Sequence, residues 1–257
     1  MNYALITGAS KGIGKAIAEE LAARQFNVLL VARSENALKE IADRLIDKYQ
    51  VKADYYALDL SENGAPEKIY QWCKDRNYII EILVNNAGYG LSGSFEKYSP
   101  EENINMMELN MLVPVRLTQL FLPSLRNLPR AYILNIASTA AYQAVPGLSL
   151  YAATKAFLLR FSRGLRQELY KTKVSVTCIS PGSTDTDFSK RAQIGIKGLK
   201  AAQKVNMTPE AVAAIAVKSM LAGKAEVITG AINKLGAFLV WLFPKVLIER
   251  TAMKIYQ

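Results

Sequence analysis

Residues 7–14 read TGASKGIG and directly follow the apolar run YALI at residues 3–6. A short apolar run is typical of a buried strand, and the amphipathic pattern after residue 12 is typical of a helix. A glycine-rich turn between a strand and a helix can hold a phosphate, because glycine permits a tight turn and the helix N-terminus presents unpaired N–H groups. Gly8, Gly12 and Gly14 are not spaced as in the common G-x-G-x-x-G, so the rest of the chain must decide what the turn binds.

The chain beyond this turn alternates short apolar runs with longer amphipathic stretches. Strands are expected at residues 3–6, 27–32, 52–58, 80–85, 130–137, 173–179 and 225–228, and helices near 12–24, 35–48, 65–76, 100–127, 149–171 and 208–222. This alternation predicts βαβ units and a parallel sheet. We therefore expect an α/β fold, a Rossmann-like doubly wound parallel sheet of about seven strands with helices on both faces. No internal repeat or linker is visible, so residues 1–257 are expected to form a single domain.

The composition excludes several kinds of chemistry. The chain has no histidine and only two cysteines, so it cannot build a Ser-His-Asp or Cys-His nucleophile system or an ordinary zinc site. Proton transfer must then use Tyr, Lys, Asp, Glu or solvent. The net charge is +10, but the basic residues are scattered without interleaved aromatic residues. We expect a solvated surface and no nucleic-acid binding.

The cysteines and the first residues bear on location. Cys73 and Cys178 both lie in apolar segments, and no signal-peptide pattern precedes the first expected strand. Buried thiols and a cytoplasmic location are therefore expected.

The end of the second expected strand bears on the type of nucleotide. In dinucleotide-binding folds, Asp or Glu at this point binds the ribose 2′-hydroxyl of NAD, whereas Arg accommodates the 2′-phosphate of NADP. This chain has Arg33 there, and Lys11 lies within the glycine turn on the same side of the sheet. Two cations suit a phosphate group, so the pair predicts NADP(H). The alternative is that both residues are ordinary surface charges.

The stretch NIASTAAYQAVPGLSLYAATK, which begins within the fifth expected strand, holds candidate catalytic residues. Ser138 follows the strand, and Tyr151 and Lys155 are four residues apart on one face of a helix. A nearby ammonium stabilises a phenolate and lowers the phenol pKa from about 10. Tyr151 could then give a proton to a substrate oxygen that Ser138 holds, while a nicotinamide supplies the hydride. The spacing alone is a weak signal, because Tyr70 and Lys74 share it without a polar strand-end partner.

Together these motifs resemble those of the short-chain dehydrogenases/reductases, from the glycine turn to about Phe188. Asp59 in ALDL resembles the family residue that contacts adenine, and NNAG at 85–88 resembles the segment that lines the cofactor site. PGSTDT at 181–186 resembles the stretch that closes over the nicotinamide. Asn110 in ELNMLVP resembles the residue that kinks its helix, completes a Ser–Tyr–Lys–Asn tetrad and holds a water in a proton relay to the lysine.

The resemblance implies a set of site residues and a quaternary structure. The implied catalytic residues are Asn110, Ser138, Tyr151 and Lys155. The implied NADP(H)-binding residues are Gly8, Ser10, Lys11, Gly12, Ile13, Gly14, Arg33, Asp59, Leu60, Asn86, Ala87, Gly88, Tyr151, Lys155, Pro181, Gly182, Thr184 and Thr186. No metal is implied. The helices at 100–127 and 149–171 correspond to those that form dimers or tetramers in the family, so a homodimer or homotetramer is expected.

Two segments fall where the family varies. Residues 187–206, DFSKRAQIGIKGLKAAQKVN, correspond to the substrate lid, and their lysines could meet an anionic part of a substrate or belong to a solvated loop. Residues 231–257 form a hydrophobic C-terminal extension. Its apolar run at 235–243 is too short to span a bilayer, which needs about 20 residues, and Pro244 then interrupts it.

Basic side chains at 234, 245, 250 and 254 flank the apolar run of the extension. The extension could pack over the substrate cleft, form an oligomer contact or lie in a membrane interface as a peripheral contact. The first two interpretations are favoured. A similar tail occurs in relatives that act on lipid-like ketones, which implies an apolar substrate.

These features predict an NADP(H)-dependent oxidoreductase that transfers a hydride between the nicotinamide and a carbonyl or secondary alcohol. The small-molecule substrate is expected to be apolar, lipid-like or a 3-oxoacyl compound. The alternatives are a non-catalytic nucleotide-binding regulatory protein and a peripheral membrane scaffold with the same fold. The complete tetrad argues against a regulatory protein, which has no chemical reason to keep Tyr151 and Lys155 paired.

Overall fold

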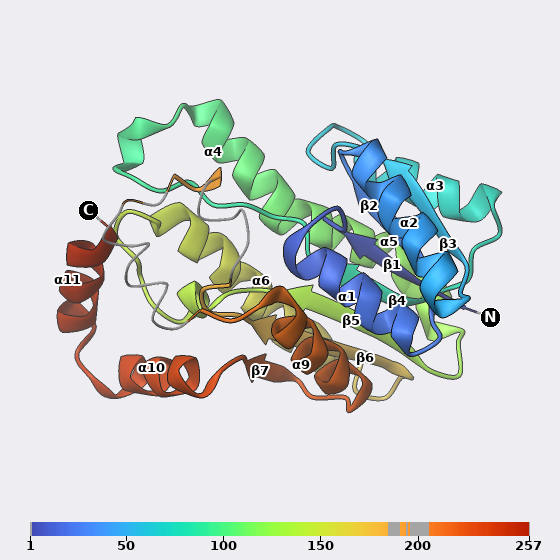
Figure 1. Ribbon diagram of the computed structural model, residues 1–257. Helices are drawn as coiled ribbons and strands as arrows, with labels where there is room; N and C mark the ends of the chain where they lie inside the picture. Colours follow the sequence, from blue (N-terminus) through green and yellow to red (C-terminus); the bar gives the residue numbers. More distant parts are fainter. Residues whose placement is uncertain (1, 185–190, 194, 196–205, 257) are drawn as a thin grey trace.

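The computed structural model describes residues 2–184, 191–193, 195 and 206–256. At its centre lies a parallel sheet of seven strands, as the sequence predicts, and the strand order is β3-β2-β1-β4-β5-β6-β7 (Figure 1). The direction of the strand order changes between β1 and β4, which is where ligands bind in folds of this kind. The strands span Tyr3–Thr7 (β1), Asn27–Ala32 (β2), Ala53–Ala57 (β3), Ile80–Asn85 (β4), Ala131–Ile136 (β5), Val174–Ser180 (β6) and Glu226–Ile228 (β7).

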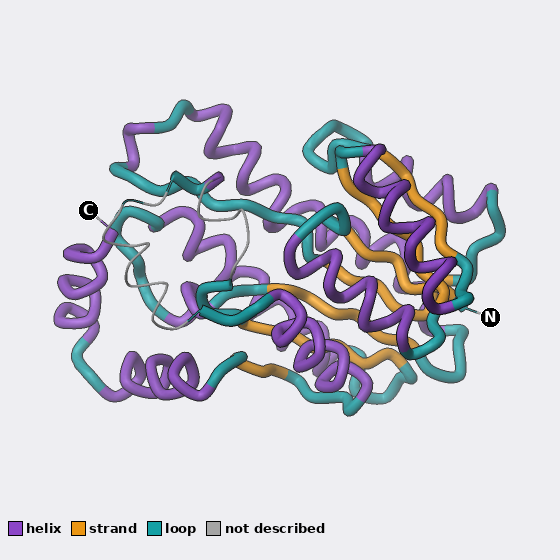
Figure 2. The backbone as a smooth tube through the Cα atoms, in the orientation of Figure 1, coloured by secondary structure: helices purple, strands orange, loops and turns teal. Residues whose placement is uncertain are grey.

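Helices cover both faces of the sheet because alternate strand residues point to opposite sides (Figure 2). Ile6 and Leu30 belong to the core under α1, α2 and α9, whereas Leu5 and Leu29 belong to the core under α3, α5 and α6. All four side chains are fully buried, so the strands read as continuous apolar runs. The helices span Gly12–Ala23 (α1), Glu35–Tyr49 (α2), Ala65–Asp75 (α3), Pro100–Met107 (α4), Val113–Arg126 (α5), Ser149–Glu168 (α6) and Pro209–Leu221 (α9).

The helix expected over residues 100–127 forms as one continuous helical run, but it is not α-helical throughout. A π-helical segment, Glu108–Leu112, separates α4 from α5 and contains Asn110. The buried side chain of Asn110 donates hydrogen bonds to the backbone oxygen of Tyr89 and to the hydroxyl of Thr154. Such π-helical turns are frequent at functional sites, and this one places an amide side chain between two other elements.

The C-terminal extension forms two helices, α10 (Ala231–Leu242) and α11 (Lys245–Tyr256), with Phe243 and Pro244 between them. Figure 1 shows both at the end of the molecule away from the N-terminus, beyond the strand ends. No helix within the described ranges combines the length and the apolar character needed to cross a bilayer.

Candidate active site

A cavity of about 1210 Å³ lies at the carboxyl ends of the strands. Pockets for drug-sized ligands occupy about 300–1,000 Å³, so this cavity has room for a large ligand and a second small molecule. Its walls bring together the predicted residues Gly8, Ser10, Lys11, Gly12, Ile13, Arg33, Asp59, Leu60, Asn86, Ala87, Gly88, Ser138, Tyr151, Lys155, Pro181, Gly182 and Thr184. Gly14 and Asn110 are not part of the lining. Thr186 and most of residues 187–206 lie outside the described residues.

The glycine turn after β1 needs its glycines for two different reasons. Gly8 and Gly12 have φ angles of 66° and 55°, in the left-handed region that favours glycine. Gly14 has an ordinary φ, but a Cβ atom there would overlap the carbonyl oxygen of Gly8. Because glycine meets both requirements, the start of α1 can pack closely against the turn. The N-terminus of α1 then lies at the cavity. A phosphate fits this position because the first N–H groups of a helix lack partners within it.

The NNAG segment after β4 is attached to this turn by hydrogen bonds. The hydroxyl of Thr7 donates to the backbone oxygen of Val84 and accepts from the backbone N–H groups of Asn86 and Ala87 at 3.0 and 3.1 Å. The side chain of Asn86 donates back to the backbone oxygens of Thr7 and Gly8 at 2.9 and 3.2 Å. The two strand ends on either side of the switch point therefore form one connected wall of the cavity.

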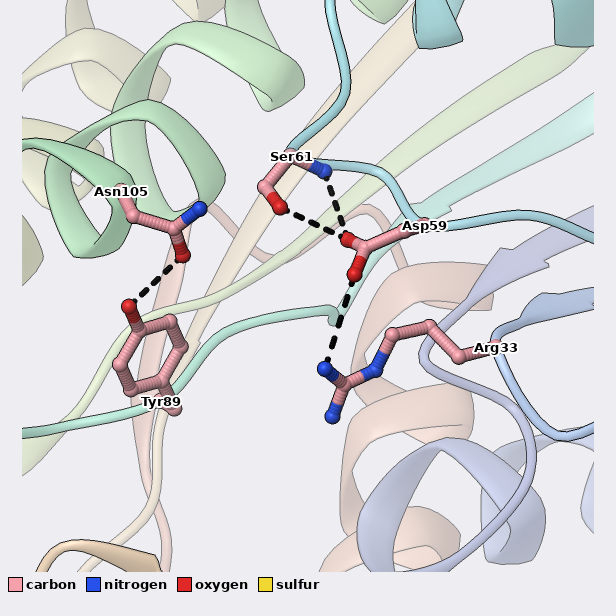
Figure 3. Close-up of polar contacts among 5 residues, drawn as sticks. All are labelled: Arg33, Asp59, Ser61, Tyr89 and Asn105. Atoms are coloured by element: carbon pink, nitrogen blue, oxygen red, sulfur yellow. Dashed lines mark hydrogen bonds and ion pairs between the residues drawn. The ribbon is translucent and has the colours of Figure 1, made fainter. Parts of the chain in front are cut away.

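Arg33 and Asp59, from the ends of β2 and β3, form an ion pair of 3.6 Å between Nη1 and Oδ2 (Figure 3). Asp59 also accepts hydrogen bonds from the backbone and hydroxyl of Ser61 at 3.0 and 2.8 Å. Partial burial by itself would raise the pKa of Asp59, but Ser61 and Arg33 outweigh it and the pKa is lowered. The Arg33 side chain is 60% exposed, so the pair holds it only weakly and leaves it able to meet an added anion.

Arg191 is a further cation of the cavity wall, and sequence reasoning did not single it out. Its guanidinium lies over the ring of Tyr89, 4.0 Å from the centroid, and the Tyr89 hydroxyl donates to Asn105 at 2.8 Å (Figure 3). Burial, and then the charge of Arg33, lower the pKa of Arg191. The next residue, Ala192, is buried and accepts a hydrogen bond from the backbone of Ser92. The available signals were its place in the basic segment 187–206, the expected lid, and the aromatic residue directly after NNAG.

The predicted serine, tyrosine and lysine meet at the opposite part of the cavity. Lys155 is only 5% exposed, and its Nζ lies 5.8 Å from the centroid of the Tyr151 ring on the same face of α6. Burial lowers the pKa of Lys155 to about 8. Ser138 begins the short 3-10 turn Thr139–Tyr142 and accepts a hydrogen bond from the backbone of Ala140. A hydroxyl, a phenol and a buried amine on one wall can hold an oxygen atom and exchange a proton with it.

Asn110 is buried directly next to the cavity wall but does not line the cavity. Its side-chain oxygen accepts from the backbone N–H of Tyr89, and its amide group donates to Tyr89 and Thr154. Gly88 makes this arrangement fit, because a Cβ there would lie 2.8 Å from the Asn110 oxygen and 3.4 Å from the Lys155 amine. Asn110 is therefore placed to position the cavity wall and Lys155, and not to touch a bound molecule directly.

The second Y-x-x-x-K pair shows why spacing alone is a weak signal. Lys74 lies 5.7 Å from the centroid of the Tyr70 ring, nearly the same separation as in the Tyr151–Lys155 pair. Tyr70, however, packs edge-on against Phe121 of α5, and neither residue lines the cavity. The location relative to the strand ends, and not the pair itself, distinguishes the candidate site.

The extension also contributes to the cavity, which sequence reasoning left as one of three alternatives. Residues of α10 and α11 line it, among them Ile232, Asn233, Ala237, Val240, Ile248 and Ala252. Asn233 packs so closely on Gly182 that a Cβ there would overlap its amide group. It also donates to the backbone oxygen of Thr229 at 2.8 Å. The segment after β6 and the extension thus form one continuous wall.

The sequence is similar to that of known oxidoreductases. A family model described as short chain dehydrogenase matches residues 2–196. Ketoacyl reductase HetN from Nostoc sp. is 33% identical over 231 residues, covering 87% of this chain and 77% of that protein. Very-long-chain 3-oxoacyl-CoA reductase-B from Danio rerio is 36% identical over 193 residues, covering 73% of this chain and 61% of the relative.

A solved structure agrees over nearly the whole length. The short-chain dehydrogenase from Sphingobium yanoikuyae in complex with NADPH has a TM-score of 0.83 and 29% sequence identity, with 94% of each chain covered. This likeness shows that the fold extends over nearly the whole chain, including at least part of the C-terminal extension.

Proposed function

Because the chain belongs to the short-chain dehydrogenase family, whose members are oxidoreductases with a nicotinamide cofactor, we propose that it is an NADP(H)-dependent reductase of apolar ketones or 3-oxoacyl compounds. The observation that carries the proposal is the buried Lys155 beside Tyr151, with Ser138 on the same cavity wall. Burying an amine costs stability, and here the amine lies next to a phenol that lines the cavity and could exchange a proton with a ligand.

The proposed mechanism divides the work among these side chains. The bound nicotinamide supplies the hydride that reaches the carbonyl carbon. The Ser138 hydroxyl donates a hydrogen bond to the carbonyl oxygen and holds it in place. The Tyr151 hydroxyl gives its proton to that oxygen, and the Lys155 ammonium stabilises the phenolate that remains. Asn110 keeps the wall and Lys155 in position through Tyr89, Thr154 and its contact with Gly88.

The preference for NADP(H) rests on the charges at the other part of the cavity. Lys11, Arg33 and Arg191 all line it, and a phosphate monoester on the ribose would be attracted to this group of cations. Asp59 is already paired with Arg33 and hydrogen-bonded to Ser61, so its negative charge is partly neutralised. The relative from Sphingobium yanoikuyae was solved with NADPH, which supports the same assignment.

The proposed substrate class follows from the walls beyond Tyr151. Leu109, Val145 and Leu148 line the cavity and belong with Tyr151 to one apolar cluster, and Val240 of α10 also lines the cavity. An aliphatic chain would bury apolar surface against them. Two of the relatives are named as reductases of ketoacyl or very-long-chain 3-oxoacyl-CoA compounds. These points favour a carbonyl group carried on an aliphatic chain.

We also propose that the protein works as a homodimer or homotetramer. Phe157 of α6 is partly exposed on a helix that the family resemblance assigns to subunit contacts, and Leu112 lies exposed at the end of the π-helical segment. Apolar residues on such faces favour association with a second copy.

The proposal is tested by NADPH oxidation across ketones, aldehydes and 3-oxoacyl thioesters of increasing chain length. We expect turnover that improves with chain length and that is faster with NADPH than with NADH. Tight NADPH binding without turnover on the whole panel would instead favour the regulatory protein.

A further inference from the structure

We propose that α10 and α11 form a docking surface for an anionic lipid bilayer. The tail surface, as we name it, consists of Leu235, Phe238, Trp241, Leu242, Phe243 and Leu247. All six are exposed, and none of them lines the cavity. The proposal concerns the side of the two helices that faces away from the candidate active site, and it does not depend on the proposed chemistry.

The tail surface concentrates exposed apolar side chains in one segment. Ten of the seventeen exposed large hydrophobic residues in the described part of the chain lie between Ile232 and Met253. Trp241 is 79% exposed, and its ring lies 6.0 Å from that of Phe238. The others are spread singly over elements from α2 to the end of α6. Contiguous apolar surface of this kind marks a protein or membrane contact.

The charges around the tail surface indicate what covers it. In the sequence, Lys234, Lys245, Arg250 and Lys254 lie before, between and after its residues, and Glu249 is the acidic residue of the same segment. A second copy docked through this surface would bring two basic groups together. Anionic lipid headgroups would neutralise them while the apolar residues enter the acyl boundary, the usual arrangement of helices that lie on membranes. Charge complementarity therefore favours the bilayer over a second copy.

The dimensions of the helices fit a position on the bilayer and not across it. Each helix has 12 residues, and Pro244 lies between them. A helix of this length extends about 18 Å, well short of the hydrocarbon core of about 30 Å. Both helices would lie in the interface, with Trp241 at headgroup level, where tryptophan is enriched.

The opposite side of these helices gives the docking surface a consequence for the cavity. Val240 of α10 and Ile248 of α11 line the cavity, next to tail-surface residues in the sequence. A bilayer bound to the tail surface would lie directly outside this wall. If the proposed substrate class is correct, an aliphatic substrate dissolved in the membrane would need to pass only this wall to reach Tyr151.

The test is co-sedimentation of the full chain with vesicles of phosphatidylglycerol and phosphatidylcholine, compared with phosphatidylcholine alone. We expect binding that is at least about tenfold stronger to the anionic vesicles and that weakens with salt. The variant Leu235→Glu/Trp241→Glu should lose at least about tenfold in binding, because two charges would enter the interface. Tyr170→Glu is the matched control, since Tyr170 is 78% exposed just after α6 and should bind like the original chain.

Further readouts separate the remaining outcomes. Turnover of a water-soluble ketone should be unchanged in the double variant, so loss of activity and loss of docking are distinguishable. In a Trp72→Phe chain, whose remaining tryptophan is Trp241, the emission should shift to shorter wavelength when anionic vesicles are added. Equal vesicle binding by both chains, or no binding by either, would overturn the proposal. So would a dimer that dissociates in the double variant, because the covering partner would then be a second copy.

Discussion

The Nζ atom of Lys155 donates a hydrogen bond to the backbone oxygen of Ile136 across 2.9 Å, and so attaches α6 to the carboxyl end of β5. No carboxylate forms an ion pair with Lys155 among the residues that the structure describes. The amine is therefore buried without a compensating charge, and burial lowers its pKa from 10.5 to about 8. This arrangement reduces stability at neutral pH in exchange for a cation at the active site.

Replacing Lys155 by Met is expected to abolish turnover and yet to stabilise the cofactor-free protein at pH 7. The lowered pKa corresponds to a cost of about 3 kcal/mol for the buried ammonium, and the lost hydrogen bond offsets about 1 kcal/mol of the gain. Thermal denaturation at pH 7 should show a net gain of about 1–3 kcal/mol in the free energy of unfolding.

The pH dependence of this difference has a definite sign. Between pH 8 and 10.5 the unfolded chain keeps the lysine proton while the folded chain has lost it, so the stability of the original protein rises with pH through this group. The advantage of Lys155→Met should therefore shrink between pH 8 and 10. An advantage that stays constant over this range would show that Lys155 is not the group responsible.

Gly88→Ala is expected to destabilise the protein and to slow turnover. The new Cβ would lie 2.8 Å from the Asn110 oxygen, so the NNAG segment or the π-helical segment must move at a cost of about 1–3 kcal/mol. Gly164→Ala is the matched control, because Gly164 lies within α6 with open space at its Cβ position. It should stabilise the chain by about 0.5–1 kcal/mol. Chemical denaturation measures the free energy of unfolding of both variants. An unchanged value for Gly88→Ala would contradict the close packing of Gly88 against Asn110.

Arg33→Ala is expected to raise the KM for NADPH by roughly 10- to 100-fold and to leave the KM for NADH nearly unchanged. The reason is that the charge-assisted contact with the 2′-phosphate, worth about 1.5–3 kcal/mol, exists only for NADPH. Arg44→Ala provides the control, because Arg44 forms an ion pair with Glu19 away from the cavity. Steady-state kinetics with both cofactors measure the ratio. An equal rise in KM for both cofactors would mean that Arg33 does not bind the 2′-phosphate.

Much of the fold and of the candidate site was predictable because it depends on local sequence. The apolar runs gave the strands to within a residue or two, as with residues 52–58 for the strand Ala53–Ala57. A helix between two strands allows the strands to run parallel, and strands that follow each other in the sequence are usually neighbours. The neighbouring strands β2 and β3 therefore end side by side. The proximity of Arg33 and Asp59 is a consequence of that order, although neither the ion pair nor its geometry could be read from the sequence.

The features that escaped prediction depend on contacts between distant parts of the chain. The hydrophobic periodicity over residues 100–127 does not reveal the π-helical segment, although the family resemblance implies a kink at Asn110. The segment accompanies the hydrogen bonds of Asn110 to Tyr89 and Thr154. Likewise, the apolar run at 235–243 does not reveal which side of α10 lines the cavity and which side stays exposed. Arg191 lies over the ring of Tyr89 although about 100 residues separate them in the sequence. Local sequence patterns do not predict a contact between residues so far apart.

The measurement that tests the central claim most directly is the turnover of Tyr151→Phe with NADPH and a ketone that the original chain reduces. Tyr151 lines the cavity beside Lys155, and the substitution removes only its hydroxyl group. We expect turnover to fall by about 10²–10⁴-fold, the usual contribution of general acid catalysis, while the Kd for NADPH changes by less than about threefold. Turnover within a factor of two of the original chain, with NADPH binding intact, would contradict the assignment of Tyr151 as the proton donor.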